Sequence, residues 1–262
     1  MSDQSTNQNT SEPPQERRIN PWTVPVLMII IALGLVVGYN YLMKHAVGNR
    51  GMPNDRLPYI GALEKSLILT EKSGEEVDVK NLNGKIFLAS YLFTRCPSGC
   101  AGIAAEMASV RDLYKDDRLH FLSVSLDPEH DTPEVMQAFS DEHDLGGDDW
   151  WHLTGDGKSI RTYMAHQFGF YPPKKKAEEA KLFEDDLFVH DMRIVLVDHR
   201  LQIRGYYEVM HPTLADVHVE RLRKDVGLLL KEMDKEEKEK AQKKKEEAAA
   251  AAANAEAAES SD

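Results

Sequence analysis

The chain begins with a polar stretch that leads into a long apolar one. Residues 1–20 hold almost nothing that could be buried, so we expect them to be disordered. Residues 22–43 carry no charge, and roughly 20 apolar residues suffice to cross the ~30 Å hydrocarbon core of a bilayer as a helix. Trp22, Tyr39 and Tyr41 lie near the ends of this run, as aromatic residues do at membrane interfaces. The run is long for a cleaved signal peptide and no small-residue cleavage site follows it, so we predict an uncleaved transmembrane anchor.

After a linker at residues 44–56, the apolar positions alternate between strand-like and helix-like patterns. Apolar runs at 67–70 and 77–79 flank a Glu-Lys-Ser-Gly turn, which suggests a β-hairpin. Further strands are expected at residues 86–93, 120–126, 150–155, 189–198 and 201–208. A helical pattern accompanies the cysteines, and further helices are expected from about Thr132, over 158–168 and from 214 to about 231. Strands that alternate with helices in this way predict an α/β domain with a mixed sheet at residues 57–230.

The two cysteines of the chain, Cys96 and Cys100, follow a buried strand and open a helix. This placement makes a thioredoxin-like mixed sheet flanked by helices the leading fold. A spacing of four puts both side chains on one helical face, with Cys100 one turn into the helix. A helix N-terminus favours anions, so we expect lowered thiol pKa values, and an inward-pointing Arg95 would lower that of Cys96 further. Such a pair can cycle between dithiol and disulfide, hold a soft metal such as copper(I) or zinc, or be an inert dithiol.

A metal at this pair needs a further ligand, and imidazole is the most plausible one. Among ten histidines, His190 stands out because it begins a predicted buried strand. In a thioredoxin-like sheet, the start of that strand lies beside the helix that carries the cysteines. A lone histidine on a strand is nevertheless more often structural than a ligand, so the residues alone leave both interpretations open.

Composition excludes some classes of function and indicates where the domain ends. The net charge of −12 argues against a nucleic-acid binder, which would show a basic face. Two cysteines fall short of the four ligands of a structural zinc site, which are usually richer in thiols. Residues 231–262 are a low-complexity Lys/Glu/Ala tail with high helix propensity and no apolar stripe, so we expect a solvated helix or disorder there.

Four segments resemble the SCO/SenC family of membrane-anchored, thioredoxin-fold copper proteins. They are FTRCPSGC at residues 93–100, SVSLDPEHDTPE at 123–134, WHLTG at 151–155 and HDMRIVLVD at 190–198. The resemblance implies a copper(I) site made of Cys96, Cys100 and His190. It also implies a role in delivering copper to, or reducing thiols of, the copper-accepting subunit of cytochrome c oxidase. Because that delivery occurs on the outer face, the domain is expected on the extracytoplasmic side, periplasmic or equivalent.

This chain departs from the family at a few positions. Arg95 and Ala101 flank the cysteines where the family has other residues, and Asp191 follows the histidine where it often has a small hydroxyl residue. Asp191 could orient the imidazole or be solvated. Asp127 aligns with a family carboxylate, and we interpret it as a turn residue.

Three functions follow from the sequence. The first is a membrane-anchored copper metallochaperone for oxidase assembly. The second is a thiol-disulfide oxidoreductase that uses Cys96 and Cys100 as redox-active thiols. The third is an adaptor that docks a partner through its acidic surface or its charged tail. We favour the first, and the first two are compatible because the dithiol must be reduced to bind copper.

Overall fold

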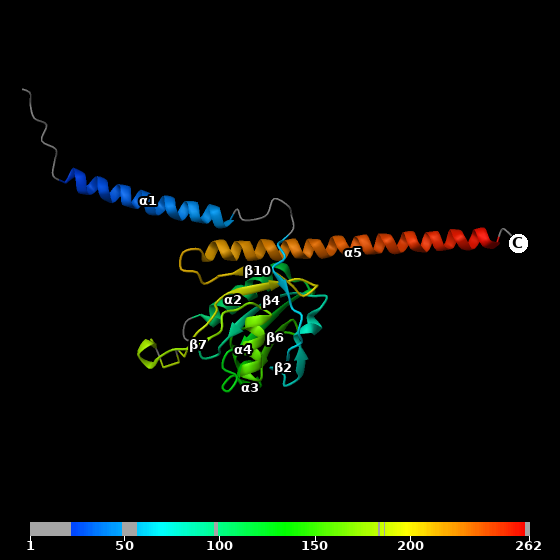
Figure 1. Cartoon of the computed structure of the whole chain (residues 1–262), viewed down its shortest axis with the longest axis horizontal. Helices are drawn as coiled ribbons and strands as arrows, with labels where there is room; N and C mark the ends of the chain where they lie inside the picture. The colour runs from blue at the N-terminus through cyan, green and yellow to red at the C-terminus, as the bar shows by residue number, and fades with distance from the viewer. Residues whose placement is uncertain (1–21, 49–56, 97–98, 183, 186, 260–262) are drawn as a thin grey trace, which may run out of the picture. The chain divides into compact units, whose positions relative to one another are not determined.

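A computed structural model describes residues 22–48, 57–96, 99–182, 184–185 and 187–259 (Figure 1). The chain forms two compact units, Met1–His45 and Ala46–Asp262. In the first unit the helix α1 (Thr23–Gly48) contains a segment, Val24–Met43, that is long and apolar enough to cross a membrane. The predicted disordered lead at residues 1–20 lies outside the described residues, as does most of the predicted linker, and α1 includes the linker's first residues.

In the described part of the second unit, eight strands form one mixed sheet in the order β1-β10-β9-β4-β5-β6-β2-β3. The strands of this sheet are β1 (Gly61–Ala62), β2 (Ile68–Glu71), β3 (Glu76–Asp78), β4 (Ile86–Leu92), β5 (Leu119–Ser125), β6 (Trp150–Thr154), β9 (Ile194–Val197) and β10 (Gln202–Tyr207). The central strands β4, β5 and β6 are parallel, and β9 and β2 pair antiparallel to their two outer members. The predicted mixed α/β sheet is therefore confirmed.

Four α-helices and two short 3-10 helices connect the strands in the described part of this unit. They are η1 (Val79–Leu82), α2 (Cys100–Tyr114), α3 (Pro133–Glu142), α4 (Gly157–His166), η2 (Glu178–Ala180) and α5 (Ala215–Glu259). Between α4 and β9 lies a second, two-stranded sheet made of β7 (Lys174–Lys175) and β8 (Phe188–Val189). We call the segment from β7 to β8 the β7–β8 hairpin. It lies between the helix predicted at 158–168 and the strand predicted at 189–198, where no element was expected.

The strand β4 lies at the centre of the core and is buried along its whole length. On one face of the sheet, Ser90 contacts the sulfur of Met107 in α2. On the other face, Phe87 packs edge-on against Phe168, and Tyr91 packs against the ring at position 170. Because the residues of a strand point to alternate faces, burial of every β4 side chain requires cover on both sides. The end of this strand therefore holds the loop that follows it on a rigid base.

The strand predicted at residues 189–198 begins later than expected, at Ile194. The cause is Asp191, whose buried carboxylate accepts hydrogen bonds from the backbone N–H groups of Tyr171 and Arg193. These bonds turn the backbone out of the sheet, so ladder pairing starts only after Arg193. The prediction that His190 begins the strand is consequently wrong, because His190 lies in the loop between β8 and β9.

The last helix continues past the boundary that the sequence suggested at residue 231. In the structure α5 runs without interruption from Ala215 to Glu259. It packs along β10, β4 and α2, and its second half continues past the sheet (Figure 1). Met233 is buried although it lies beyond the predicted boundary.

Candidate metal centre

The two cysteines lie where β4 passes into α2. Cys96 is half-buried in the loop after the strand, and its backbone N–H donates to the carbonyl of Phe93 at 2.9 Å. Cys100 is the first residue of α2 and is 2% exposed. The helix therefore starts later than the sequence suggested, at Cys100, so Cys96 lies outside it. The N-cap is Gly99, whose φ of −156° is extended and whose carbonyl accepts from Ile103 N–H.

His190 approaches the cysteines from the other side of the site. Its ring lies edge-on to that of Tyr91 in β4, with centroids 6.4 Å apart. Its Nδ1 lies 2.8 Å from the backbone carbonyl oxygen of Asp191. A carbonyl only accepts, so this contact requires the proton on Nδ1 and leaves Nε2 as the unprotonated nitrogen. The backbone thus fixes both the orientation and the tautomer of the imidazole.

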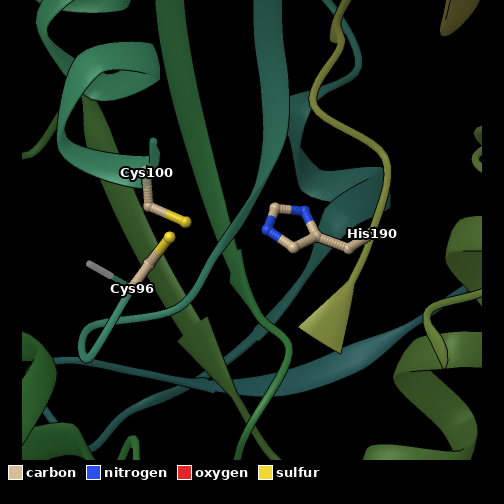
Figure 2. Close-up of side chains that lie close together, drawn as sticks. All are labelled: Cys96, Cys100 and His190. Carbon is tan, nitrogen blue, oxygen red and sulfur yellow. The ribbon is translucent and has the colours of Figure 1, made fainter. Parts of the chain in front are cut away.

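The structure brings Cys96, Cys100 and His190 together. One ligand atom from each residue lies within 4.8 Å of the others. Figure 2 shows the two sulfur atoms facing each other and the imidazole edge turned toward them. Residues separated by about ninety positions in sequence therefore converge, because β4 and β9 are neighbours in the sheet. Two thiols and one imidazole at this separation form a three-donor set suited to a soft metal ion.

The electrostatics of Cys100 differ from the sequence expectation. A hydrogen bond with Cys96 raises the pKa of the Cys100 thiol well above its usual value, and burial and the neighbouring sulfur raise it further. The predicted lowering of the pKa by the helix N-terminus is therefore wrong for Cys100. The helix dipole acts on it, but desolvation and a second sulfur outweigh that effect in the metal-free dithiol.

Arg95 is engaged by carboxylates. One guanidinium nitrogen lies 2.6 Å from Asp127, and the other lies 3.5 Å from Asp185 in the β7–β8 hairpin. The backbone of Asp127 also forms a turn, since its carbonyl accepts from the N–H groups of His130 and Asp131. Asp127 therefore combines the predicted turn role with an ion pair that the sequence did not reveal.

A buried carboxylate holds the cysteine loop, by which we mean the segment that leads from the end of β4 at Leu92 to Cys96. Asp131 is fully buried and accepts hydrogen bonds from the hydroxyls of Thr94, at 2.5 Å, and Ser125, at 2.6 Å. Burial raises the pKa of Asp131. The N-cap of α3 is the neighbouring Thr132, so Asp131 is not needed to cap that helix. Asp131 instead ties the loop that carries Cys96 to the end of β5.

Asp191, the residue after the histidine ligand candidate, is buried and held by Arg193. Their side chains form an ion pair at 2.5 Å, and the guanidinium hydrogen bond lowers the pKa of Asp191 against the effect of its burial. Of the two interpretations of Asp191, solvation is wrong because the carboxylate is buried, whereas the residue does contact the imidazole, through its backbone carbonyl and not through its carboxylate. The carboxylate shapes the loop and the carbonyl orients His190.

Several other histidines lie away from the cysteines and contact the core, a carboxylate or the backbone. His152 is fully buried in β6, and His199 lies 3.1 Å from the carboxylate of Glu236 in α5. His211 accepts backbone N–H groups at the start of α5 through its Nδ1. In the described chain, the Cys96, Cys100 and His190 group is where three potential ligands of the His, Cys, Asp and Glu types converge.

The fold and the site together define a thioredoxin-like protein with two thiols and an imidazole gathered at the start of α2. The family profile described as SCO1/SenC matches residues 61–224, which is more than half of the chain. The chain therefore belongs to the SCO1/SenC family, as its sequence motifs predicted.

Similar proteins agree with this assignment. The SCO1 protein homolog of Bacillus subtilis is 26% identical over 159 residues, which cover 60% of this chain and 80% of that protein. The SCO2-like protein of Rickettsia typhi is 25% identical over 122 residues, or 43% of this chain and 58% of that protein.

Solved structures share the fold. A SCO1/SenC family lipoprotein from Bacillus anthracis has a TM-score of 0.56 at 23% identity and covers 66% of this chain and 97% of its own. BsSco, a member of the Sco family of cytochrome c oxidase assembly proteins in which a disulfide switch was identified, has a TM-score of 0.53 at 22% identity. It covers 66% of this chain and 98% of its own. The predicted thioredoxin-like fold is thereby confirmed.

Proposed function

We propose that this protein is a membrane-anchored copper metallochaperone that binds copper(I) through Cys96, Cys100 and His190. The observation that carries the proposal is the convergence of the three donors within 4.8 Å. Thiolate sulfur selects copper(I) over hard ions, and the imidazole adds a third donor to the two sulfurs. Membership of the SCO1/SenC family supports the same assignment.

Copper binding at this site is coupled to proton release. Both thiols give up a proton as copper(I) binds, while the neutral tautomer of His190 that donates from Nδ1 to the carbonyl of Asp191 offers its Nε2 lone pair to the metal. The high pKa of Cys100 keeps its thiol protonated without metal, so an incoming cation must displace that proton. Transfer to an acceptor then reverses the exchange, with copper remaining in the +1 state. Cys96, the more exposed of the two cysteines, is the sulfur that an acceptor reaches first.

The proposed acceptor is the copper-accepting subunit of cytochrome c oxidase. In support, BsSco is described as belonging to a family of cytochrome c oxidase assembly proteins. The Val24–Met43 segment is long and apolar enough to hold the protein in a membrane, where such an oxidase resides. We place the second unit on the extracytoplasmic side. A protease-protection experiment on intact cells that finds this unit in the cytoplasm contradicts the placement.

Copper(I) titration of the full chain in detergent, against a competing chromophoric chelator, tests the site. We expect one copper(I) per chain for the wild type and loss of tight binding in Cys96→Ser. We expect His190→Ala to weaken affinity by more than the roughly 10–100-fold typical of losing an outer-shell partner. The exposed His166→Ala serves as a matched control and should bind as the wild type does. Absence of copper(I) affinity in the reduced wild type defeats the proposal.

A thiol-disulfide oxidoreductase is the second candidate, because the two sulfurs face each other (Figure 2). The Cys96 thiolate would attack an acceptor disulfide and form a mixed disulfide, releasing one acceptor thiolate. Cys100 would then lose its proton to solvent and attack the sulfur of Cys96, releasing the second acceptor thiolate. The acceptor gains two electrons as Cys96 and Cys100 become a disulfide.

The same variants separate the two functions. Reduction of a model disulfide peptide should be lost in Cys96→Ser under either function. If exchange is fast in the wild type and in His190→Ala, while copper(I) affinity is absent in both, the oxidoreductase is the better assignment. If copper(I) binds tightly and depends on His190, the metallochaperone is supported.

A further inference from the structure

Two methionines lie against glycines at the start of α2. A Cβ at Gly99 would overlap the terminal methyl group of Met192 and would lie 3.7 Å from its Sδ. A Cβ at Gly102 would lie 3.1 Å from the terminal methyl of Met210 and 3.2 Å from its Sδ. Each thioether therefore occupies space that a glycine leaves open beside the helix.

Both contacts fall on the turn of α2 that carries Cys100. Gly99 is the N-cap of the helix and Gly102 is its third residue. Residues three apart share one side of a helix, about 5–6 Å from each other, so the two thioethers cover neighbouring positions on that side. Cys100 lies between the two glycines in sequence. Met192 is also linked to the site through the chain, because it follows His190 by two residues.

The sulfur-containing residues around the start of α2 differ in how deeply they are buried. Met210 is 40% exposed, Met192 is half-buried against the core, and Cys100 is 2% exposed. Soft sulfur donors are therefore present at the surface, at an intermediate depth and at the buried thiol. Because nothing in the Cys96, Cys100 and His190 group requires a thioether, the proposed metal site does not account for the two methionines.

We infer that Met210 and Met192 form an entry path by which copper(I) reaches Cys96, Cys100 and His190. The inference rests on the proposed function and extends it. A thioether is a soft ligand that selects copper(I), and unlike a thiol it has no proton to lose before it binds. It is also neutral, so it holds the ion less tightly than two thiolates do. The ion therefore moves from the methionines to the cysteines.

The transfer step balances. Bonds between copper(I) and the thioether sulfurs break as bonds to the sulfurs of Cys96 and Cys100 form. The two thiol protons leave to solvent, and copper remains in the +1 state throughout. No oxidant or reductant is required.

Packing is the competing explanation for these residues, because methionine fills irregular gaps in cores. Leucine separates the two explanations. A Met→Leu exchange keeps the volume and the apolar character, but it removes the sulfur. Met233→Leu in α5 is a control for the loss of a thioether from the packed core, since this methionine is buried and lies outside the path.

The first experiment measures loading kinetics of the reduced full chain in detergent. Copper(I) is supplied as its bicinchoninate complex, and loss of the chelate absorbance is followed by stopped flow. We expect the Met192→Leu/Met210→Leu double variant to load about tenfold more slowly than the wild type, because a softly ligated path to the buried thiols is lost. The equilibrium affinity should stay within about twofold, because the three final ligands are intact. Met233→Leu should load at the wild-type rate.

A second measurement observes the sulfurs directly. In the Cys96→Ser/Cys100→Ser variant labelled with methyl-¹³C methionine, silver(I) serves as a redox-inert probe for copper(I). We expect the methyl signals of Met192 and Met210 to shift while that of Met233 does not. Unshifted signals, or a double Leu variant that loads at the wild-type rate, overturn the inference and leave the proposed function standing. A wild type that takes up no copper(I) defeats both.

Discussion

The imidazole of His152 lies in strand β6, where neither solvent nor a hydrogen-bond partner among the described residues would stabilise its protonated form. It is fully buried and stacks on Trp150, with ring centroids 5.8 Å apart. Within the described residues neither of its ring nitrogens has a hydrogen-bond partner. Burial lowers the pKa of His152 to about 3, so the native protein keeps this ring neutral. A polar ring held neutral in a dry core makes the stability of the domain depend on pH.

The direction of this dependence follows from proton linkage. The unfolded chain takes up a proton at His152 below about pH 6.5, whereas the native chain does so only near 3. Stability is therefore present above pH 6.5 and is lost as the pH falls toward 3. The loss at pH 5 from this one residue is about 2 kcal/mol. We expect His152→Leu to remove that loss.

Urea unfolding of the metal-free full chain at pH 7.5 and pH 5.0 measures the effect. The difference in stability between the two pH values should be smaller in His152→Leu than in the wild type by about 2 kcal/mol. The exposed His166→Leu should leave the difference unchanged. Equal pH dependence in all three proteins would show that His152 titrates normally in the native state.

Asp131 is the residue beneath the cysteine loop whose replacement should affect both stability and the metal site. Asp131→Ala removes the acceptor of the half-buried Thr94 hydroxyl and of the buried Ser125 hydroxyl. We expect a loss of about 1–3 kcal/mol in unfolding free energy and weaker copper(I) binding, because Thr94 is two residues from Cys96. Asp131→Asn retains one acceptor oxygen and should lose less of both.

Denaturant unfolding and copper(I) competition on the same two variants check this role. A purely structural role would lower stability in Asp131→Ala and leave the copper(I) affinity of the folded fraction unchanged. An alanine variant as stable as the wild type would show that the two hydrogen bonds contribute nothing.

At single positions, the sequence predicted the function of those residues whose type alone indicates their chemistry, such as cysteine and histidine. Cys96, Cys100 and His190 were identified from thiol spacing and a motif, and the structure brings them together. The supporting residues were not predicted in their roles. An aspartate in a loop is usually solvated, and whether it is buried, as Asp131 and Asp191 are, depends on strands distant in sequence.

Among the elements, the β7–β8 hairpin and the cysteine loop form one contact surface. Phe93 packs edge-on against Phe188 in β8, with ring centroids 5.4 Å apart. Arg95 bridges from the cysteine loop to Asp127 at 2.6 Å and to Asp185 at 3.5 Å. The side chain of Asp127 is 14% exposed and that of Asp185 is 51% exposed, so the first ion pair is the stronger. The charge of Arg95 is therefore compensated mainly by Asp127.

Removal of that compensation should increase the reactivity of the adjacent thiol. In Asp127→Asn, the guanidinium of Arg95, the residue before Cys96, keeps its charge while its nearest carboxylate is lost. A larger thiolate fraction at Cys96 results, and we expect its alkylation by iodoacetamide at pH 7 to be roughly threefold faster. Peptide mass spectrometry resolves Cys96 from Cys100. Asp185→Asn is the matched control and should react at the wild-type rate, and an unchanged rate in Asp127→Asn would contradict this coupling.

The elements themselves were largely predictable, and their ends were not. The hairpin of β2 and β3 and the strands β4, β5 and β6 fall within a few residues of their predicted bounds because apolar runs define them. The start of β9 was missed because Asp191 draws backbone N–H groups away from the ladder. The start of α2 was placed too early because the capping geometry of Gly99 is not written in residue type.

For the whole chain, the two units carry different parts of the proposed function. The first contributes α1, whose Val24–Met43 segment is suited to a membrane, and the second contributes the sheet and the site. The sequence described residues 231–262 as one charged tail. The structure divides this stretch, because α5 contacts the domain through its first residues beyond 231 and is exposed from Glu237 to the end of its described side chains.

Beyond residue 231, the contacts that hold α5 to the domain lie between residues 232 and 236. Met233 is buried, Asp234 lies 2.7 Å from Arg118, and Glu236 lies 3.1 Å from the imidazole of His199. Burial of a methionine side chain is worth about 1.5–3 kcal/mol, and each partly exposed ion pair adds about 0–1 kcal/mol. Farther along, Lys243 and Glu247 form an exposed ion pair one helical turn apart. Such a pair stabilises the helix itself and not its attachment to the domain.

Two truncations of the otherwise intact chain test this division. Removal of residues 238–262 should leave the thermal midpoint unchanged and reduce only the helical signal. Removal of residues 232–262 should cost about 2–4 kcal/mol and lower the midpoint by roughly 5–15 °C. Circular dichroism in detergent follows both. Copper(I) affinity and oxidase assembly should survive the shorter deletion, because α5 beyond residue 237 contributes no residue to the proposed site. If that deletion stops oxidase assembly while stability and copper(I) affinity persist, the outer part of α5 docks a partner, as the adaptor hypothesis requires.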